Sequence, residues 1–182
     1  MTHPLWEFIR TVPDFPKSGI EFYDITPLLN GHHDKLIDAM IAAVPADVMA
    51  DTDAIVGIES RGFVLASLLA VRLHKKLILV RKAGKLPPPV HAQSYGLEYA
   101  QDTLEISAEL EPAKVLIIDD VLATGGTLKA AHSLCIKANL TPLGFLVLLD
   151  LPALHGDLGL SYWTVLEKQP HQKASATVQT LF

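Results

Sequence analysis

The chain has 182 residues, a length that suits one domain with a full hydrophobic core. Hydrophobic residues make up 49% of it and charged residues 19%, which is typical of a folded globular protein and argues against a disordered one. The net charge of −5 gives no support to nucleic-acid binding, so any anionic ligand requires a local cluster of positive side chains.

The N-terminal part predicts short elements separated by breakers. Residues 5–11 predict a short helix, which the prolines at 13 and 16 end. Residues 19–24 predict a short extended piece. Apolar residues then recur at helical spacing and predict a helix over 34–44.

From residue 54 onward, apolar runs with strand length alternate with apolar helices. This alternation predicts an α/β fold, in which a parallel twisted sheet carries helices on both faces. The expected strands are 54–58, 76–80, 114–118 and 143–149, and the expected helices are 62–74 and 128–138.

One stretch interrupts the alternation. Residues 81–92 hold three positive charges, one glycine and three consecutive prolines, which indicates an irregular and functional loop. Residues 94–107 alternate loosely and predict a hairpin or flap. The polar stretch 169–182 predicts a loose tail, although its last two residues are apolar and could dock.

The strongest chemical signal follows the expected strand at 114–118. Asp119 and Asp120 come directly after it, and the loop 123–127 then opens a helix. Ligands of open parallel sheets bind beyond the carboxyl ends of the strands, and a helix N-terminus suits a phosphate. The loop offers close backbone approach and hydroxyl donors from Ala123, Thr124, Gly125, Gly126 and Thr127. A structural turn with an Asp cap is the alternative, but two acids directly before the loop favour a ligand site.

Residues 115–127 resemble the motif with which type I phosphoribosyltransferases bind phosphoribosyl pyrophosphate (PRPP). Further segments resemble the adenine-specific branch of that family and follow in the family's order: 14–20, 24–29, 59–63, 81–87 and 94–99. The resemblance implies the type I phosphoribosyltransferase fold with a hood over 1–30 and a flap over 81–107. It also implies the conversion of adenine and PRPP to AMP and pyrophosphate with Mg²⁺, in a homodimer.

The resemblance also implies roles for the residues that match. The loop 123–127 would hold the ribose 5-phosphate, and the two acids would hold the ribose hydroxyls. The pyrophosphate would lie against Ser60, Arg61, Lys82 and Lys85. Arg81 would reach a neighbouring subunit, and a cis peptide is expected between Glu59 and Ser60. From composition alone, a solvated basic loop is the alternative for the charges at 81–85.

On the base side, Glu98 resembles the family's flap glutamate, which would accept a proton from the purine as N9 attacks the sugar. Its alternative is an exposed glutamate on a hairpin. We therefore expect Glu98, Arg61 and Lys85 to act in catalysis. Adenine would lie between Phe22 and Val121, with a main-chain carbonyl near Glu21 reading its amino group.

No histidine has a partner at metal-ligand spacing, so the histidines are expected to be surface or packing residues. The acid pair suits sugar hydroxyls or a hydrated Mg²⁺, and no direct protein ligand of Mg²⁺ is predicted. The sequence also departs from the family, because Tyr23 stands where some members carry arginine and Ala100 where glycine is usual.

Two other functions remain open at this point. One is a phosphoribosyltransferase for 6-oxopurines, but such enzymes read the oxygen with a late-strand lysine that residues 142–151 lack. The other is a PRPP-sensing regulator, but this acidic chain has no spare DNA-binding part. The single cysteine and the absence of an apolar run of ~20 residues predict a cytoplasmic protein without membrane or nucleic-acid partners.

Overall fold

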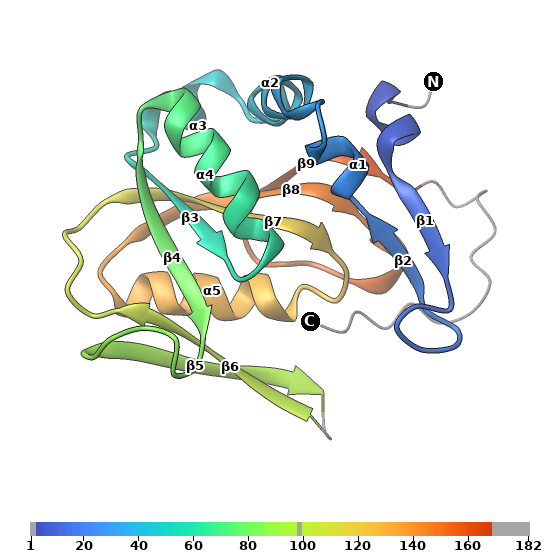
Figure 1. The fold of residues 1–182 in the computed structure, drawn as a ribbon. Coiled ribbons are helices and arrows are strands. Elements are labelled where there is room, and N and C mark those ends of the chain that lie inside the picture. The colour runs from blue at the N-terminus through green and yellow to red at the C-terminus, as the bar shows by residue number, and fades with distance from the viewer. Residues whose placement is uncertain (1–2, 98–99, 169–182) are drawn as a thin grey trace.

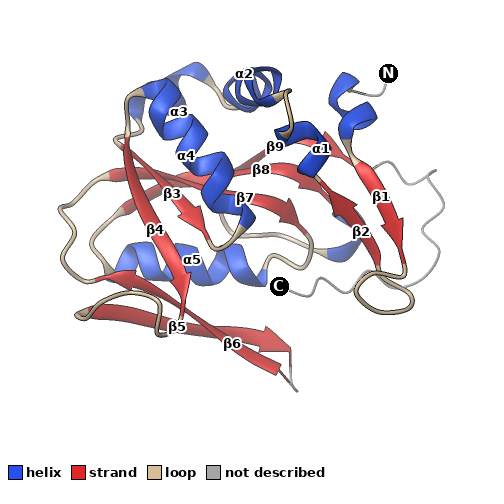
Figure 2. Ribbon diagram, in the orientation of Figure 1, coloured by secondary structure: helices blue, strands red, loops and turns tan. Residues whose placement is uncertain are grey.

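The computed structural model describes residues 3–97 and 100–168. Within this part of the chain, the main sheet has seven strands in the order β5-β6-β4-β3-β7-β8-β9 (Figures 1 and 2). The strands from β4 to β9 pair in parallel, whereas β6 and β5 join the edge antiparallel. The parallel strands are β4 (Lys76–Lys82), β3 (Ala54–Ile58), β7 (Lys114–Leu122), β8 (Thr141–Asp150) and β9 (Tyr162–Glu167).

Helices cover both faces of this sheet, as the sequence predicts (Figure 2). One face carries α2 (His33–Ala43), α3 (Ala46–Asp51) and α4 (Arg61–Leu73), and the other carries α5 (Gly126–Lys137). Successive residues of β7 alternate between the two cores, because Leu116 and Ile118 join one cluster while Val115 and Ile117 join the other. Burial on both faces explains why this strand is continuously apolar.

The N-terminal hood differs from its prediction. The expected helix over 5–11 is wrong beyond Phe8, since only a 3₁₀ turn forms, η1 (Pro4–Phe8). The chain then enters β1 (Arg10–Pro13), which pairs antiparallel with β2 (Glu21–Asp24). Branched side chains at positions 11 and 12 favour a strand, and the pairing with β2 satisfies their backbone groups. The helix α1 (Thr26–Leu29) follows β2.

The interrupted stretch forms a hairpin. β5 (Val90–Leu97) and β6 (Ala100–Ser107) pair antiparallel, so the hairpin expected over 94–107 is confirmed and starts four residues earlier. The expected loop over 81–92 is too long, because β4 continues to Lys82 and is held there by β6. The hairpin tip at 98–99 lies outside the described residues, as does the predicted tail at 169–182.

Four short elements escaped prediction: α1, α3, η2 (Pro152–Leu154) and β9. The strand β9 alternates only weakly in burial and therefore has no clear apolar period. None of the helices in the described ranges is long and apolar enough to cross a bilayer.

Candidate active site

Two strand-to-helix turns meet at the carboxyl edge of the sheet. β3 leads into α4 and β7 leads into α5, and Gly57 of β3 is paired with Ile118 of β7. The turns touch at Gly62, where an added Cβ would lie 3.0 Å from Oδ1 of Asp119. Glycine is therefore required for the first turn of α4 to pack against the acids of β7.

The acids lie inside β7 rather than after it. The predicted end of this strand at residue 118 is too early, because pairing with β8 continues as far as Leu122 opposite Asp150. Asp119 and Asp120 are consequently buried, at 6% and 1% exposure. The backbone N–H of Asp120 donates to Oδ1 of Asp119 over 2.9 Å.

Burial controls the protonation of this acid pair. Burial, and next the charge of Asp120, raise the pKa of Asp119 well above its usual range. Burial also raises the pKa of Asp120, although the Arg61 guanidinium acts against that rise. Nη2 of Arg61 lies 2.7 Å from Oδ2 of Asp120. Within the described ranges this oxygen accepts no well-oriented hydrogen bond, so Arg61 meets it mainly as a charge.

The turn into α5 is held by apolar packing. Gly125, the N-cap residue, has a φ of +79°, a conformation that favours glycine. An added Cβ there would lie 2.6 Å from Cδ2 of Leu158. Thr124 is exposed beside it. Among the described residues no side chain caps α5, so its first N–H groups can serve a ligand.

The turn into α4 is held by charge. The expected cis peptide between Glu59 and Ser60 is confirmed. The Glu59 carboxylate accepts hydrogen bonds from the backbone N–H of Lys82 at 3.0 Å and from Nε of Arg81 at 3.3 Å. Burial acts to raise the pKa of Glu59, but these two donors hold it below its usual value. Arg81 is thus bound within its own chain, and its reach to a neighbouring subunit stays a prediction.

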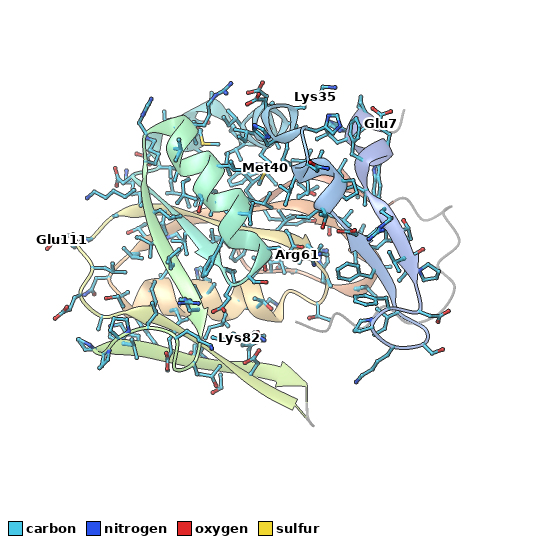
Figure 3. The ribbon with its side chains drawn as sticks, in the orientation of Figure 1. Glu7, Lys35, Met40, Arg61, Lys82 and Glu111 are labelled. Atoms are coloured by element: carbon cyan, nitrogen blue, oxygen red, sulfur yellow. The ribbon has the colours of Figure 1, made fainter. Side chains whose placement is uncertain are left out.

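Positive side chains come to this edge from the β3–α4 turn and from the end of β4. Figure 3 labels Arg61 at the start of α4 and Lys82 at the end of β4. Nζ of Lys82 pairs with Asp102 of the hairpin over 3.0 Å. Lys85 is exposed in the following turn, where its N–H donates to the Lys82 carbonyl. The structure therefore brings the predicted phosphate-binding residues to one edge.

Arg61 also connects the acids to the hood. Its Cζ lies 4.9 Å from the centre of the Phe22 ring, and its Nη1 donates to the Tyr23 carbonyl over 3.2 Å. Val121 is buried in the same core cluster as Tyr23. The predicted base-binding residues thus lie next to the acid pair, while the predicted sandwich of the base between Phe22 and Val121 stays a prediction.

Two polar clusters at the margins of the site were not predicted from the sequence. The Tyr23 hydroxyl donates to Glu21 over 2.6 Å, and Lys168 pairs with Glu21 and lies over the Tyr23 ring. Burial, and next the bond to Glu21, raise the pKa of Tyr23, whereas Lys168 and Tyr23 lower that of Glu21 against its burial. The second cluster joins His155 to Asp150. Lys168 is 147 residues from Glu21, and the spacing of His155 from Asp150 matches no motif that the sequence analysis used.

The remaining predicted site residue, Glu98, lies outside the described residues. Within the described ranges no three metal-ligating side chains gather in one place.

Comparison with known proteins identifies the family. A model of the phosphoribosyl transferase domain matches residues 32–180. An adenine phosphoribosyltransferase from Hydrogenovibrio crunogenus is 46% identical over 153 residues, which cover 84% of this chain and 88% of the relative. The chain belongs to the adenine phosphoribosyltransferases.

Solved structures of adenine phosphoribosyltransferases have the same fold. That from Rhodothermus marinus has a TM-score of 0.81 and 40% identity, covering 90% of this chain and 96% of its own. That from Saccharomyces cerevisiae, complexed with adenine and an imino-altritol bisphosphate, has a TM-score of 0.77 and 32% identity, covering 89% of this chain and 96% of its own. The type I phosphoribosyltransferase fold expected from the sequence is confirmed.

Proposed function

We propose that this chain transfers the phosphoribosyl group of PRPP to N9 of adenine, giving AMP and pyrophosphate, at the edge where β3, β4 and β7 end. The observation that carries the proposal is the buried acid pair beside the uncapped start of α5. Carboxylates accept hydrogen bonds from sugar hydroxyls, and the N–H groups at a helix N-terminus donate to a phosphate. The relative from Hydrogenovibrio crunogenus and the two solved structures described above are all named adenine phosphoribosyltransferases.

The β7–α5 turn would bind the ribose phosphate half of PRPP. The loop 123–127 would hold the 5-phosphate, and Asp119 and Asp120 would accept from the ribose hydroxyls. The buried Oδ2 of Asp120, which lacks a well-oriented donor among the described residues, supports this role. A hydroxyl donor would supply the hydrogen bond that a buried oxygen normally makes.

The β3–α4 turn would bind the pyrophosphate. As the bond from C1′ to oxygen breaks, its electron pair goes to pyrophosphate, and Ser60, Arg61, Lys82 and Lys85 would stabilise that charge. Lys82 would exchange its partner Asp102 for the ligand. Mg²⁺ would come with PRPP and be held mainly by PRPP oxygens. The bound ion would neutralise charge on the leaving group.

The hood would read the base. The Tyr23 carbonyl already accepts a hydrogen bond from Arg61 and therefore faces the site. The amino group of adenine could donate to a main-chain carbonyl between Glu21 and Tyr23, whereas the oxo group of hypoxanthine would meet it unfavourably. Phe22 would stack on the ring opposite Val121. β8 has no lysine for a 6-oxygen, which disfavours the 6-oxopurine alternative.

Glu98 would complete the chemistry. It would accept the proton that the purine loses as the bond from N9 to C1′ forms. The hairpin that carries it pairs through β6 with the end of β4, at Lys82 of the proposed pyrophosphate site.

An assay of the purified chain with PRPP and Mg²⁺ tests these assignments. We expect kcat/KM for adenine to exceed that for hypoxanthine and guanine by at least about 100-fold. Glu98→Gln should lower kcat by about 100-fold, while Glu109→Gln, at an exposed position after β6, should not. Equal use of adenine and hypoxanthine would overturn the base assignment, and a wild-type single-turnover rate in Glu98→Gln would overturn the role of Glu98.

We also propose that the chain works as a homodimer through α4 and the adjacent β4. Four large apolar side chains are exposed there: Val64 and Val71 on α4, and Leu77 and Leu79 on β4. A second copy would cover this surface, which continues toward the charged β3–α4 turn. Sedimentation should give a dimer mass, and Val71→Arg with Leu77→Arg should give a monomer. A monomeric wild-type chain would contradict the proposal.

A further inference from the structure

A buried carboxylate at the end of β8 lies outside the groups assigned to the reaction. Asp150 is the last residue of β8 and is 1% exposed. Its Oδ1 lies 2.7 Å from Nε2 of His155, whose side chain is 6% exposed. Its Oδ2 accepts a 3.1 Å hydrogen bond from the Tyr162 hydroxyl. Because a buried carboxylate is stable only when paired and hydrogen-bonded, these three residues form one unit.

Both ring nitrogens of His155 have polar partners. Nε2 lies 2.7 Å from the Asp150 carboxylate, and Nδ1 lies 2.9 Å from the carbonyl oxygen of Gly156. The ring therefore joins the end of β8 to the chain that follows it.

The other titratable groups around this unit are few. Tyr162 comes from β9, where Glu167 is the register partner of Asp150. Burial, and next the charge of Asp150, raise the pKa of Tyr162, so its hydroxyl stays a donor at neutral pH. Asp157 belongs to the same loop as His155, and Lys129 of α5 donates to the Asp157 carbonyl over 3.0 Å.

The loop that His155 anchors supports the proposed phosphate turn. Residues 151–161 leave β8 after Asp150 and return into β9. At their start, the N–H of Leu151 donates to the carbonyl of Leu122, the last residue of β7, over 2.9 Å. Farther along, Leu158 is buried against Gly125, with its Cδ2 2.6 Å from where a Cβ would lie. A shift of this loop therefore changes what packs under Gly125.

We propose that Asp150, His155 and Tyr162 position the 5-phosphate-binding turn, because they hold the 151–161 loop so that Leu158 fixes the conformation of Gly125. The inference rests on the proposed function, in which residues 123–127 bind the 5-phosphate. None of the three residues touches the substrate, so they are positioning residues.

This role predicts a specific kinetic pattern. The 5-phosphate is bound alike in the PRPP complex and in the transition state, so a disturbed turn raises KM for PRPP and leaves kcat nearly unchanged. KM for adenine should not change, because the base is bound by the hood. A merely structural role would instead alter both KM values and the amount of folded enzyme.

His155→Gln is the first test, because glutamine can donate to Asp150 but cannot also meet the Gly156 carbonyl as the ring does. We expect KM for PRPP to rise by up to about tenfold, the ratio that the loss of one hydrogen bond can produce. His33→Gln, an exposed histidine at the start of α2, is the matched control and should behave as wild type.

Tyr162→Phe keeps the test decisive if His155→Gln does not fold. It removes one hydroxyl from a side chain that is 37% exposed, and KM for PRPP should rise about two- to threefold. Leu158→Ala should raise the same KM. Combining it with His155→Gln or with Tyr162→Phe should add little, because both changes act through one contact.

Thr127→Ala separates the inference from the proposed function. If it leaves KM for PRPP unchanged, the proposed phosphate turn itself is wrong. If it raises KM while Tyr162→Phe and every folded His155→Gln preparation keep the wild-type KM for PRPP, the inference is overturned and the proposed function stands.

Discussion

The two strand-to-helix turns at the carboxyl edge share one topology and are stabilised in opposite ways. The β3–α4 turn is surrounded by charge, with Glu59 bound to Arg81 and Arg61 bound to Asp120. The β7–α5 turn is supported by apolar packing, with Leu158 under Gly125. Neither helix has a side-chain cap among the residues that the structure describes.

This difference shows how one edge of the sheet can bind two phosphate groups, one of which stays on the product while the other leaves. The 5-phosphate stays on the product. It therefore suits a preformed turn whose N–H groups are available to a ligand. Pyrophosphate leaves with growing charge, so a turn with several cations suits it. Those cations already have carboxylate partners, and binding exchanges one set of ion pairs for another. Each variant below tests one side of this comparison.

The largest effect should come from Asp120→Asn. Asparagine has nearly the same volume as aspartate but removes the negative charge that pairs with Arg61. It also replaces one carboxylate oxygen, a proposed acceptor for the ribose hydroxyls, with an amide NH₂ group. We expect kcat/KM for PRPP to fall by about 100-fold or more. Asp51→Asn, which breaks an exposed ion pair with Lys114, is the control and should stay within twofold of wild type, on the order expected for surface pairs. If kcat/KM for PRPP is unchanged in Asp120→Asn, Asp120 does not bind the substrate.

A smaller effect should come from Gly125→Ala, which tests the apolar turn. A side chain at positive φ costs about 1 kcal/mol, and overpacking against Leu158 adds about 1–3 kcal/mol. Gly31→Ala is a matched control, because its φ is +99° and nothing lies within 4 Å of the added Cβ. Urea unfolding should show both variants destabilised, with only Gly125→Ala raising KM for PRPP. Equal destabilisation would mean that Leu158 does not hold the turn.

The smallest effect should come from Glu59→Gln and depends on pH. The pKa of Glu59 is lower in the folded chain than its ordinary 4.5, so its charge stabilises the fold above that value. The stabilisation disappears as pH falls through the folded pKa. The gap in unfolding free energy between wild type and variant should therefore be present at pH 7 and close in acid. Glu109→Gln, on an exposed position, should show no gap at either pH, and a constant gap for Glu59→Gln would contradict the account.

Local patterns predicted much of the fold. The apolar runs of β3, β7 and β8 and the spacing in α2 and α4 each encode their own element, since both faces of the strands and one face of the helices are buried. The motif segments predicted which residues meet at the edge. Gly62 and Gly125 give the reason for these glycines in the motifs, because an added Cβ would lie 3.0 Å from Asp119 at the first position and 2.6 Å from Leu158 at the second.

What escaped prediction depends on tertiary contacts. β1 forms a strand because β2 pairs with it, and β7 extends through its two acids because β8 continues beside it. Lys168 reaches Glu21 from the other end of the chain, and Asp150 meets His155 and Tyr162 only because the loop after β8 folds back toward β9. The ion pair of Arg81 with Glu59 depends on two turns folding together.

Calorimetry with two partial ligands tests the division of labour between the turns most directly. AMP carries only the 5-phosphate, and pyrophosphate with Mg²⁺ carries only the leaving group. The account predicts that Thr127→Ala weakens AMP and leaves pyrophosphate unchanged, whereas Lys82→Gln weakens pyrophosphate and leaves AMP unchanged. Variants that weaken both ligands alike, or that exchange these effects, would contradict it.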